Sequence, residues 1–209
     1  MYLYTTVRSQ AEYSFVEKRS EFIGYCAPAD DEQTAYAFVE SIRKKHSDAR
    51  HNVYAYNLRA GNISRYSDDG EPHGTAGVPV LDVIRKAGIT DCCIVVTRYF
   101  GGVLLGTGGL LRAYTAAAAG ALEKAGAAQV GLFDIYSCAM NYTDYQKLMP
   151  LIASLGAEIS ESDFSDHVRL GVSVLASEGE KFVSAVTDCT NGRVKPTKTG
   201  EKCEFIKNL

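Results

Sequence analysis

Residues that could bind or transfer charge gather in two loops of the first half of the chain. The first loop carries three carboxylates and an imidazole within six residues, at Asp68, Asp69, Glu71 and His73. Carboxylate oxygens are ligands for Mg²⁺, and an imidazole can serve as a general base. The first loop therefore predicts a site for a charged ligand.

The second loop is rich in glycine. Its glycines are Gly101, Gly102, Gly106, Gly108 and Gly109, with Thr107 among them. Glycine at this density indicates a backbone that needs positive φ or must approach another group closely. Since the loop leads into a predicted helix, whose first N–H groups lack partners, it is suited to an anion. Close packing of a helix on a sheet is the alternative reason for these glycines.

Arginine and aromatic side chains flank both loops. Arg65 and Tyr66 precede the first, the run Arg98, Tyr99 and Phe100 precedes the second, and Arg112 follows it. Arginine can contact phosphate, and an aromatic ring can stack on a base, although core packing explains Tyr99 and Phe100 equally well. The predicted binding site therefore consists of three groups: the four ionisable residues of the first loop, the six residues named in the second loop, and these six flanking residues.

Bulk properties narrow the class of protein. The chain has 209 residues, 46% of them hydrophobic, and a net charge of −3, so it is no generic polyanion binder. It begins without a signal peptide and has no long apolar segment, which predicts a cytoplasmic protein without membrane contact. The six cysteines form no C-x-x-C pair, so we expect no structural zinc site. We also predict no metal among the site residues and no cofactor.

Local patterns predict the elements that position the two loops. An apolar run, Asp91 to Thr97, predicts a buried strand between them, and strands are also expected at Tyr13–Val16, Glu21–Ala27 and His51–Leu58. Thr75 is the expected N-cap of a helix that runs to about Lys86.

Helical spacing predicts two further helices beside these strands. One begins at Asp30-Asp31, and the other carries Leu110 and Tyr114 and ends at Gly126.

The second half follows a different pattern. From Leu132 onward, strands and helices alternate as βαββαβ, the split βαβ or ferredoxin-like unit. Capping boxes that begin at Thr143 and Ser177 are the expected helix starts. The composition changes near Gly131, so we predict an α+β protein with two domains, residues 1–130 and 131–209, each with its own core.

The motif stretch resembles a known family. The segments that carry the resemblance are Gly77-Val78-Pro79-Val80, Ile94 to Gly106 with the upstream Asp68 to Pro72, and the downstream Gly108-Gly109-Leu110. They are similar to the signature of the Impact family, bacterial YigZ branch. The second half is similar to the small domain that accompanies this signature in bacteria, so the resemblance covers nearly the whole chain.

The resemblance implies the fold of each domain. The first is expected to have the type shared by a small-subunit ribosomal protein, domain IV of elongation factor G and the GHMP kinases, with a left-handed βαβ unit. That handedness is an exception to the usual rule. The second is expected to resemble domain V of elongation factor G.

The resemblance also implies a role in translation, because eukaryotic relatives regulate it. We therefore expect a translation regulator whose partner is RNA or the ribosome. Because no serine, cysteine or lysine lies beside a plausible base in the motif stretch, we expect it to bind without turnover. Two alternatives stay open. One is an enzyme that acts on a phosphorylated small molecule, with Mg²⁺ on the carboxylates and His73 as base; the other is a module that binds a protein partner in translation control.

The same site makes a geometric prediction. Asp68, Asp69 and Glu71 should lie close to Arg98, because a charge buried without a partner would cost several kcal/mol.

Overall fold

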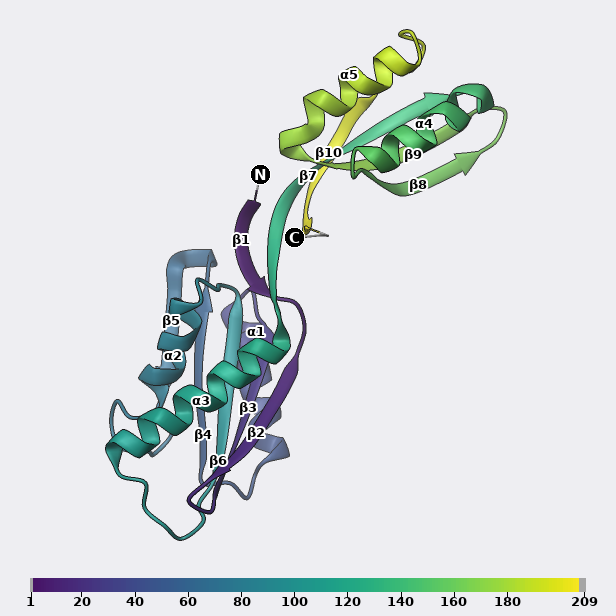
Figure 1. Cartoon of the computed structure of the whole chain (residues 1–209). Helices are drawn as coiled ribbons and strands as arrows, with labels where there is room; N and C mark the ends of the chain where they lie inside the picture. The colour runs from purple at the N-terminus through teal and green to yellow at the C-terminus, as the bar shows by residue number, and fades with distance from the viewer. Residues whose placement is uncertain (1, 207–209) are drawn as a thin grey trace. The chain divides into compact units, whose positions relative to one another are not determined.

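The computed structural model describes residues 2–206 (Figure 1). The chain divides into two compact units: Tyr4–Ala128, here the first unit, and Gln129 onward with the first residues of the chain, here the second unit. The division falls within one long strand, β7 (Ala127–Met140). The expected domain limits at 130 and 131 stay a prediction beside this division.

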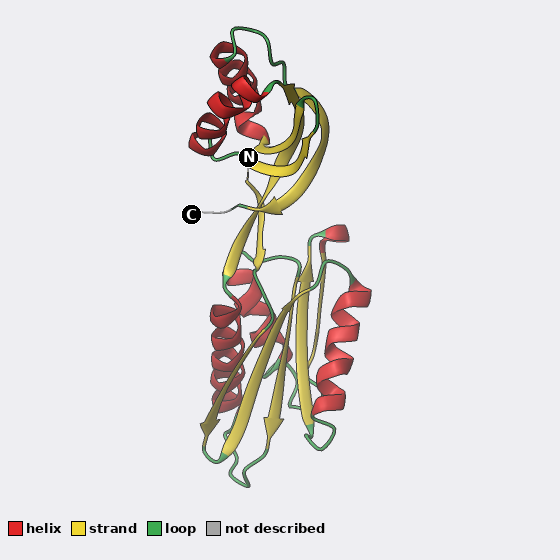
Figure 2. Ribbon diagram, turned by 90° about the vertical axis from the view of Figure 1, so that its right-hand side faces the viewer, coloured by secondary structure: helices red, strands yellow, loops and turns green. Residues whose placement is uncertain are grey.

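The first unit is a sheet with helices on both faces (Figure 2). Its strands lie in the order β2-β3-β6-β4-β5. They are β2 (Ala11–Glu17), β3 (Ser20–Pro28), β6 (Cys92–Tyr99), β4 (His51–Leu58) and β5 (Ile63–Ser67). β6 is the central strand and is buried on both faces, as its continuous apolar run predicts.

Three helices cover this sheet. α1 (Glu32–Lys45) packs on one face; α2 (Gly77–Lys86) and α3 (Thr107–Ala125) pack on the other, so a separate core lies on each side. The alanines of α3 let it approach β3 closely, where a Cβ at Gly24 would overlap the backbone carbonyl of Ala117. The connection from β5 through α2 to β6 crosses β4; its handedness stays a prediction.

The second unit has the predicted βαββαβ order. β7 is followed by α4 (Tyr142–Ser154), β8 (Glu158–Phe164), β9 (Val168–Leu175), α5 (Gly179–Cys189) and β10 (Thr197–Phe205). The strands lie in the antiparallel order β10-β7-β9-β8, and the first strand of the chain, β1 (Tyr2–Val7), joins this sheet beside β7. Leu148 and Ile152 pack in a core of their own, apart from Leu110. The mixed α+β fold with two domains is confirmed.

Several local expectations were wrong. Strands β1 and β5 were not foreseen, and Thr75 is not the cap of α2, whose N-terminal amides bind the more distant Asp68 carboxylate. Neither expected capping box forms: α4 is capped by Asn141 instead of Thr143, and α5 begins after Glu178 without a capping side chain. Among the described residues, no helix is both long and apolar enough to cross a membrane.

Candidate functional site

A buried ion pair joins the two loops of the motif. Arg98, near the end of β6, is 5% exposed, and Glu71, in the first loop, is 9% exposed. Arg98 Nη1 donates to Glu71 Oε1 at 2.6 Å, and the Tyr114 hydroxyl of α3 donates to the same oxygen at 2.8 Å. Burial, and next the Glu71 carboxylate, hold the pKa of Tyr114 well above its usual value, so this hydroxyl stays a donor. The prediction that Glu71 pairs with Arg98 is confirmed.

Aromatic rings and one unsatisfied donor complete the surroundings of Arg98. Its guanidinium carbon lies 5.4 Å from the ring centres of both Phe22 and Phe100, within the range of cation–π attraction. Nη2 reaches the Ser20 hydroxyl at 3.4 Å. The buried Nε has no hydrogen-bond partner among the described residues. Arg98 is therefore held in place while one of its donors remains unused.

The two aspartates of the first loop serve other partners. Asp68 accepts hydrogen bonds from the backbone N–H groups of Gly74, Ala76 and Gly77, so it caps α2. Asp69 accepts from the backbone N–H of Asn52 at 2.7 Å and pairs with Arg43 at 3.1 Å. Of the three carboxylates expected close to Arg98, Glu71 alone forms an ion pair with it, and Asp68 and Asp69 have other partners. Within the described residues, no cluster of carboxylate, imidazole and thiol groups could hold a metal ion.

His51 enters the site from β4, where it lies opposite Arg98 in the strand register. Its Nδ1 is 2.8 Å from the backbone oxygen of Asp69. Because a carbonyl only accepts, Nδ1 carries a hydrogen and Nε2 is directed away from that bond. Nε2 lies 4.0 Å from Glu71 Oε1. His51 was not among the predicted site residues, since only the strand pairing brings it to Arg98.

A hollow of about 390 Å³ opens beside this ion pair. Arg98, Glu71 and His51 line it together with Arg50, Phe100 and the segment 104–107. The rim is apolar and exposed: Phe100 is 44% exposed and Leu104 is 82% exposed. A hollow of this size lies within the range of small-ligand pockets.

The start of α3 forms one wall of the hollow. Gly106 occupies the N-cap position with a φ of 74°, a conformation that favours glycine, and no side chain caps the helix. The amides of the first helical turn, at Thr107, Gly108 and Gly109, therefore lack a capping side chain. This wall has the positive end of a helix dipole beside Arg50 and His51.

The remaining predicted residues lie elsewhere. Tyr99 faces away from Arg98, with its hydroxyl 2.9 Å from both Asp48 and His46 Nδ1. Arg65 and Tyr66 are on the edge strand β5, and Arg65 lies 3.9 Å from Glu32. His73 is exposed and lies 3.7 Å from Asp68. These four residues are outside the hollow.

Arg112 and two glycines of the second loop have separate surroundings. Arg112 lines a different hollow of about 250 Å³ with Lys18. Gly101 packs so closely on the Arg19 backbone that a Cβ there would overlap it, and its N–H reaches the Ser20 hydroxyl at 3.2 Å. Gly102 has a φ of 82°. The predicted site is thus divided between one hollow around Arg98 and residues with local structural contacts.

Comparison with known protein families also finds two domains in this chain. The model of the Impact N-terminal domain matches residues 18–122, and a domain of unknown function (DUF1949) matches residues 138–193. IMPACT family member YvyE of Bacillus subtilis (strain 168) is 36% identical over 202 residues, 96% of this chain and 93% of that protein. IMPACT family member YigZ of Escherichia coli (strain K12) is 35% identical over 181 residues, 85% of this chain and 89% of that protein.

A solved structure covers the same length. The crystal structure of a hypothetical protein superimposes with a TM-score of 0.61 at 32% identity, over 96% of this chain and 98% of that one. Two matched domains and relatives of full length, taken together, show that the chain belongs to the Impact family, in the bacterial branch of YvyE and YigZ.

Proposed function

We propose that this protein is a translation regulator that binds single-stranded RNA, free or on the ribosome, through the hollow beside Arg98. One observation carries the proposal: the exposed Phe100 ring stands at the rim of a hollow that also holds Arg50 and the uncapped start of α3. Stacking on a ring and contact of a phosphate with arginine and backbone N–H groups are the usual means of holding single-stranded RNA. Family membership supports a role in translation.

The roles within the hollow differ from those that the motif suggests. Arg98 is committed to Glu71, so its part is to hold the ion pair and the Phe100 ring in place. Arg50 is exposed and has no ion pair among the described residues, which leaves it free for phosphate. Phe100 supplies the stacking surface. On this basis the ligand contacts come from the rim of the hollow rather than from its buried floor.

The alternative function, an enzyme with Mg²⁺ bound by the carboxylates of the first loop, is not favoured because those carboxylates have other partners. Asp68 and Asp69 already accept hydrogen bonds from backbone N–H groups, and Glu71 is shared by Arg98 and Tyr114. A protein partner is favoured by one observation, the exposed apolar run at Val103 and Leu104. RNA binding and docking of an apolar partner are distinguished by their dependence on salt, which is steep only for RNA.

Fluorescence anisotropy with a labelled single-stranded oligouridine tests the proposal on the full chain. We expect Phe100→Ala to weaken binding by about 1–3 kcal/mol, the usual value of base stacking on a ring. The matched control is Phe164→Ala, which removes a similarly exposed ring on β8 of the second unit. Equal affinities of the Phe100→Ala variant and the unchanged protein would contradict the proposal.

Arg50→Ala serves as the second variant. Because it removes one phosphate contact, the slope of log affinity against log salt should become smaller by about 0.7, the value for a single strand. Co-sedimentation with ribosomes, repeated with both variants, shows whether the same hollow is used there. Ribosome binding that is unaffected by both variants would place the contact outside this hollow.

A further inference from the structure

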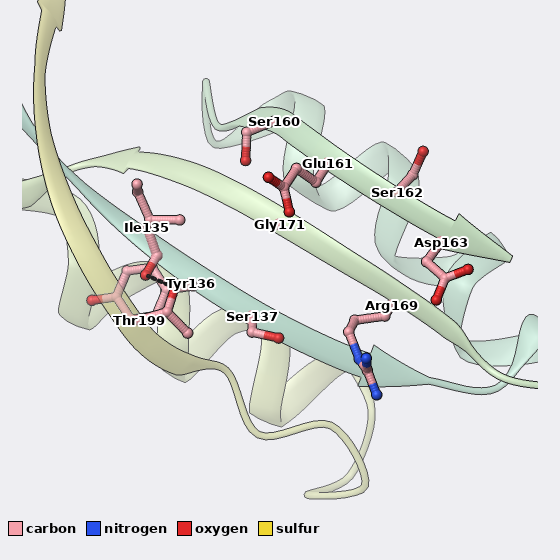
Figure 3. A pocket seen from close by; sticks show the side chains of 10 residues that line it. All are labelled: Ile135, Tyr136, Ser137, Ser160, Glu161, Ser162, Asp163, Arg169, Gly171 and Thr199. Atoms are coloured by element: carbon pink, nitrogen blue, oxygen red, sulfur yellow. Dashed lines mark hydrogen bonds between the residues drawn. The ribbon is translucent and has the colours of Figure 1, made fainter.

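A second hollow, of about 820 Å³, lies in the second unit (Figure 3). It is lined by residues of β7, β8, β9 and β10, among them Ser137, Ser160, Arg169 and Thr199. Helices α4 and α5 pack on the opposite face of this sheet, where they cover its apolar core (Figure 2). Among the described residues, no helix covers the face with the hollow.

Small polar side chains form the floor of this hollow. Ser137 and Ser160 contribute hydroxyl groups, whereas the Thr199 hydroxyl donates to the backbone oxygen of Ile135 at 3.2 Å; Gly171 lies between them on β9 (Figure 3). A Cβ at Gly171 would come within 2.9 Å of the Ser160 hydroxyl oxygen, so glycine keeps this part of the floor open. The serine hydroxyls can form hydrogen bonds with a peptide backbone, and Ile135 adds apolar surface to the lining.

Two exposed carboxylates without an ion pair among the described residues lie together at this hollow. Glu161 and Asp163 are exposed on β8, and Arg169 lies opposite Asp163 in the register; none of the three has an ion pair within residues 2–206. The two buried carboxylates of the unit, in contrast, are paired: Asp134 with Lys198 at 2.8 Å and Asp144 with Arg193 at 2.7 Å. The hollow therefore has two carboxylates and a single guanidinium that lack ion-pair partners.

We propose that this hollow docks a protein segment that carries lysine or arginine side chains. The excess of negative charge attracts such a segment and repels phosphate, so a nucleic acid is the wrong partner for this face. Glu161 and Asp163 are two residues apart on one strand, about 6.8 Å along it, which matches basic side chains at alternate positions of an extended segment. This site is independent of the RNA proposal, which concerns the first unit.

The test uses a labelled peptide of alternating lysine and serine, with its anisotropy measured on the full chain. The double variant E161Q/D163N should bind it about fivefold more weakly, as expected from the loss of two exposed ion pairs. The control E180Q/D188N makes the same change of charge on the exposed surface of α5. Circular dichroism confirms that both variants are folded.

A second variant tests the floor of the hollow directly. Ser137→Lys places a positive charge within it and should also weaken the peptide; if this variant fails to fold, E161Q/D163N decides. Equal weakening by the α5 control would show attraction by overall charge and overturn the proposal. Binding of oligouridine that is lost in E161Q/D163N would overturn it as well. So would a dimer of this chain, seen by sedimentation velocity, that Ser137→Lys abolishes.

Discussion

The hollow beside Arg98 and the hollow on the open sheet face of the second unit differ in how their charged side chains are arranged. Beside Arg98, the charges are buried and already paired within the chain, and the exposed groups are an aromatic ring, aliphatic side chains and Arg50. In the second unit, Glu161, Asp163 and Arg169 are exposed and make no ion pair within the described part of the chain. The buried ion pair beside Arg98 holds the walls of the first hollow in place, whereas the exposed charges of the second hollow remain available to a binding partner.

This contrast shows why an arginine within a sequence motif is a poor guide to ligand contacts. A buried pair loses hydration on both partners, so its geometry must be maintained by the surrounding fold. The fold of the first unit supplies this support through Tyr114 on α3 and Ser20 on β3. Mutations of the buried pair should therefore act on stability, and mutations of the exposed carboxylates should act on binding.

The largest effect is expected for Arg98→Ala. It leaves Glu71 buried without its cation, which should lower the free energy of unfolding by about 3–5 kcal/mol. Arg169→Ala, on the exposed face of the second unit, should change it by less than about 0.5 kcal/mol. Urea denaturation followed by circular dichroism measures both values.

The double variant R98M/E71L sharpens this comparison. Replacement of a buried ion pair by apolar side chains of similar volume is often neutral, so much of the lost stability should return. An Arg98→Ala variant that is nearly as stable as the unchanged protein would show that the ion pair does not stabilise the fold. Arg98 would then be a candidate for direct contact with the ligand.

A smaller effect is expected from one methyl group placed in each region. Gly101→Ala forces a Cβ into the Arg19 backbone, which cannot turn away, and should cost about 1–3 kcal/mol. Gly171→Ala meets the Ser160 hydroxyl, which can rotate, and the Glu161 Cβ at 3.2 Å, which must move only slightly, so the loss in free energy of unfolding should stay below about 1 kcal/mol. Thermal denaturation of the two variants compares them; equal losses would show that the second hollow is as rigid as the first.

The smallest effect is a difference in acid sensitivity. Burial, and next Lys45, lower the pKa of His46, whose ring nitrogens are 2.6 Å from the Tyr25 hydroxyl and 2.9 Å from that of Tyr99. The unfolded chain then binds the proton more readily, so the first unit should lose stability as the pH falls below about 6.5. Arg193 lowers the pKa of Asp144, so this contribution in the second unit is lost only below about pH 3.9.

NMR of backbone amides in each unit, during urea denaturation at neutral and mildly acidic pH, measures this difference. His46→Gln is the control, because it keeps a polar side chain that does not titrate in this range. The loss between the two pH values should disappear in this variant; an unchanged loss would assign it to another group.

Much of the fold could be predicted from local sequence. Asp31 caps α1, Gly126 ends α3, and the strand at His51–Leu58 has the expected bounds, because capping and alternation act over a few residues. The βαββαβ order of the second unit follows from the same local signals. Strand β5 was missed because its five residues have little burial to produce a pattern.

The site was only partly predictable for a related reason. The sequence determined that Glu71 and Arg98 belong to one charged region, and strand alternation already implied that Arg98 and Tyr99 face opposite sides of the sheet. Tertiary structure alone decided the rest. Pairing of β4 with β6 brings His51 to Arg98, and packing of α3 on the sheet brings Tyr114 to Glu71. Asp68 and Asp69 instead accept hydrogen bonds from backbone N–H groups. These contacts join residues 6 to 47 positions apart, and no local rule specifies which donor a given carboxylate will bind.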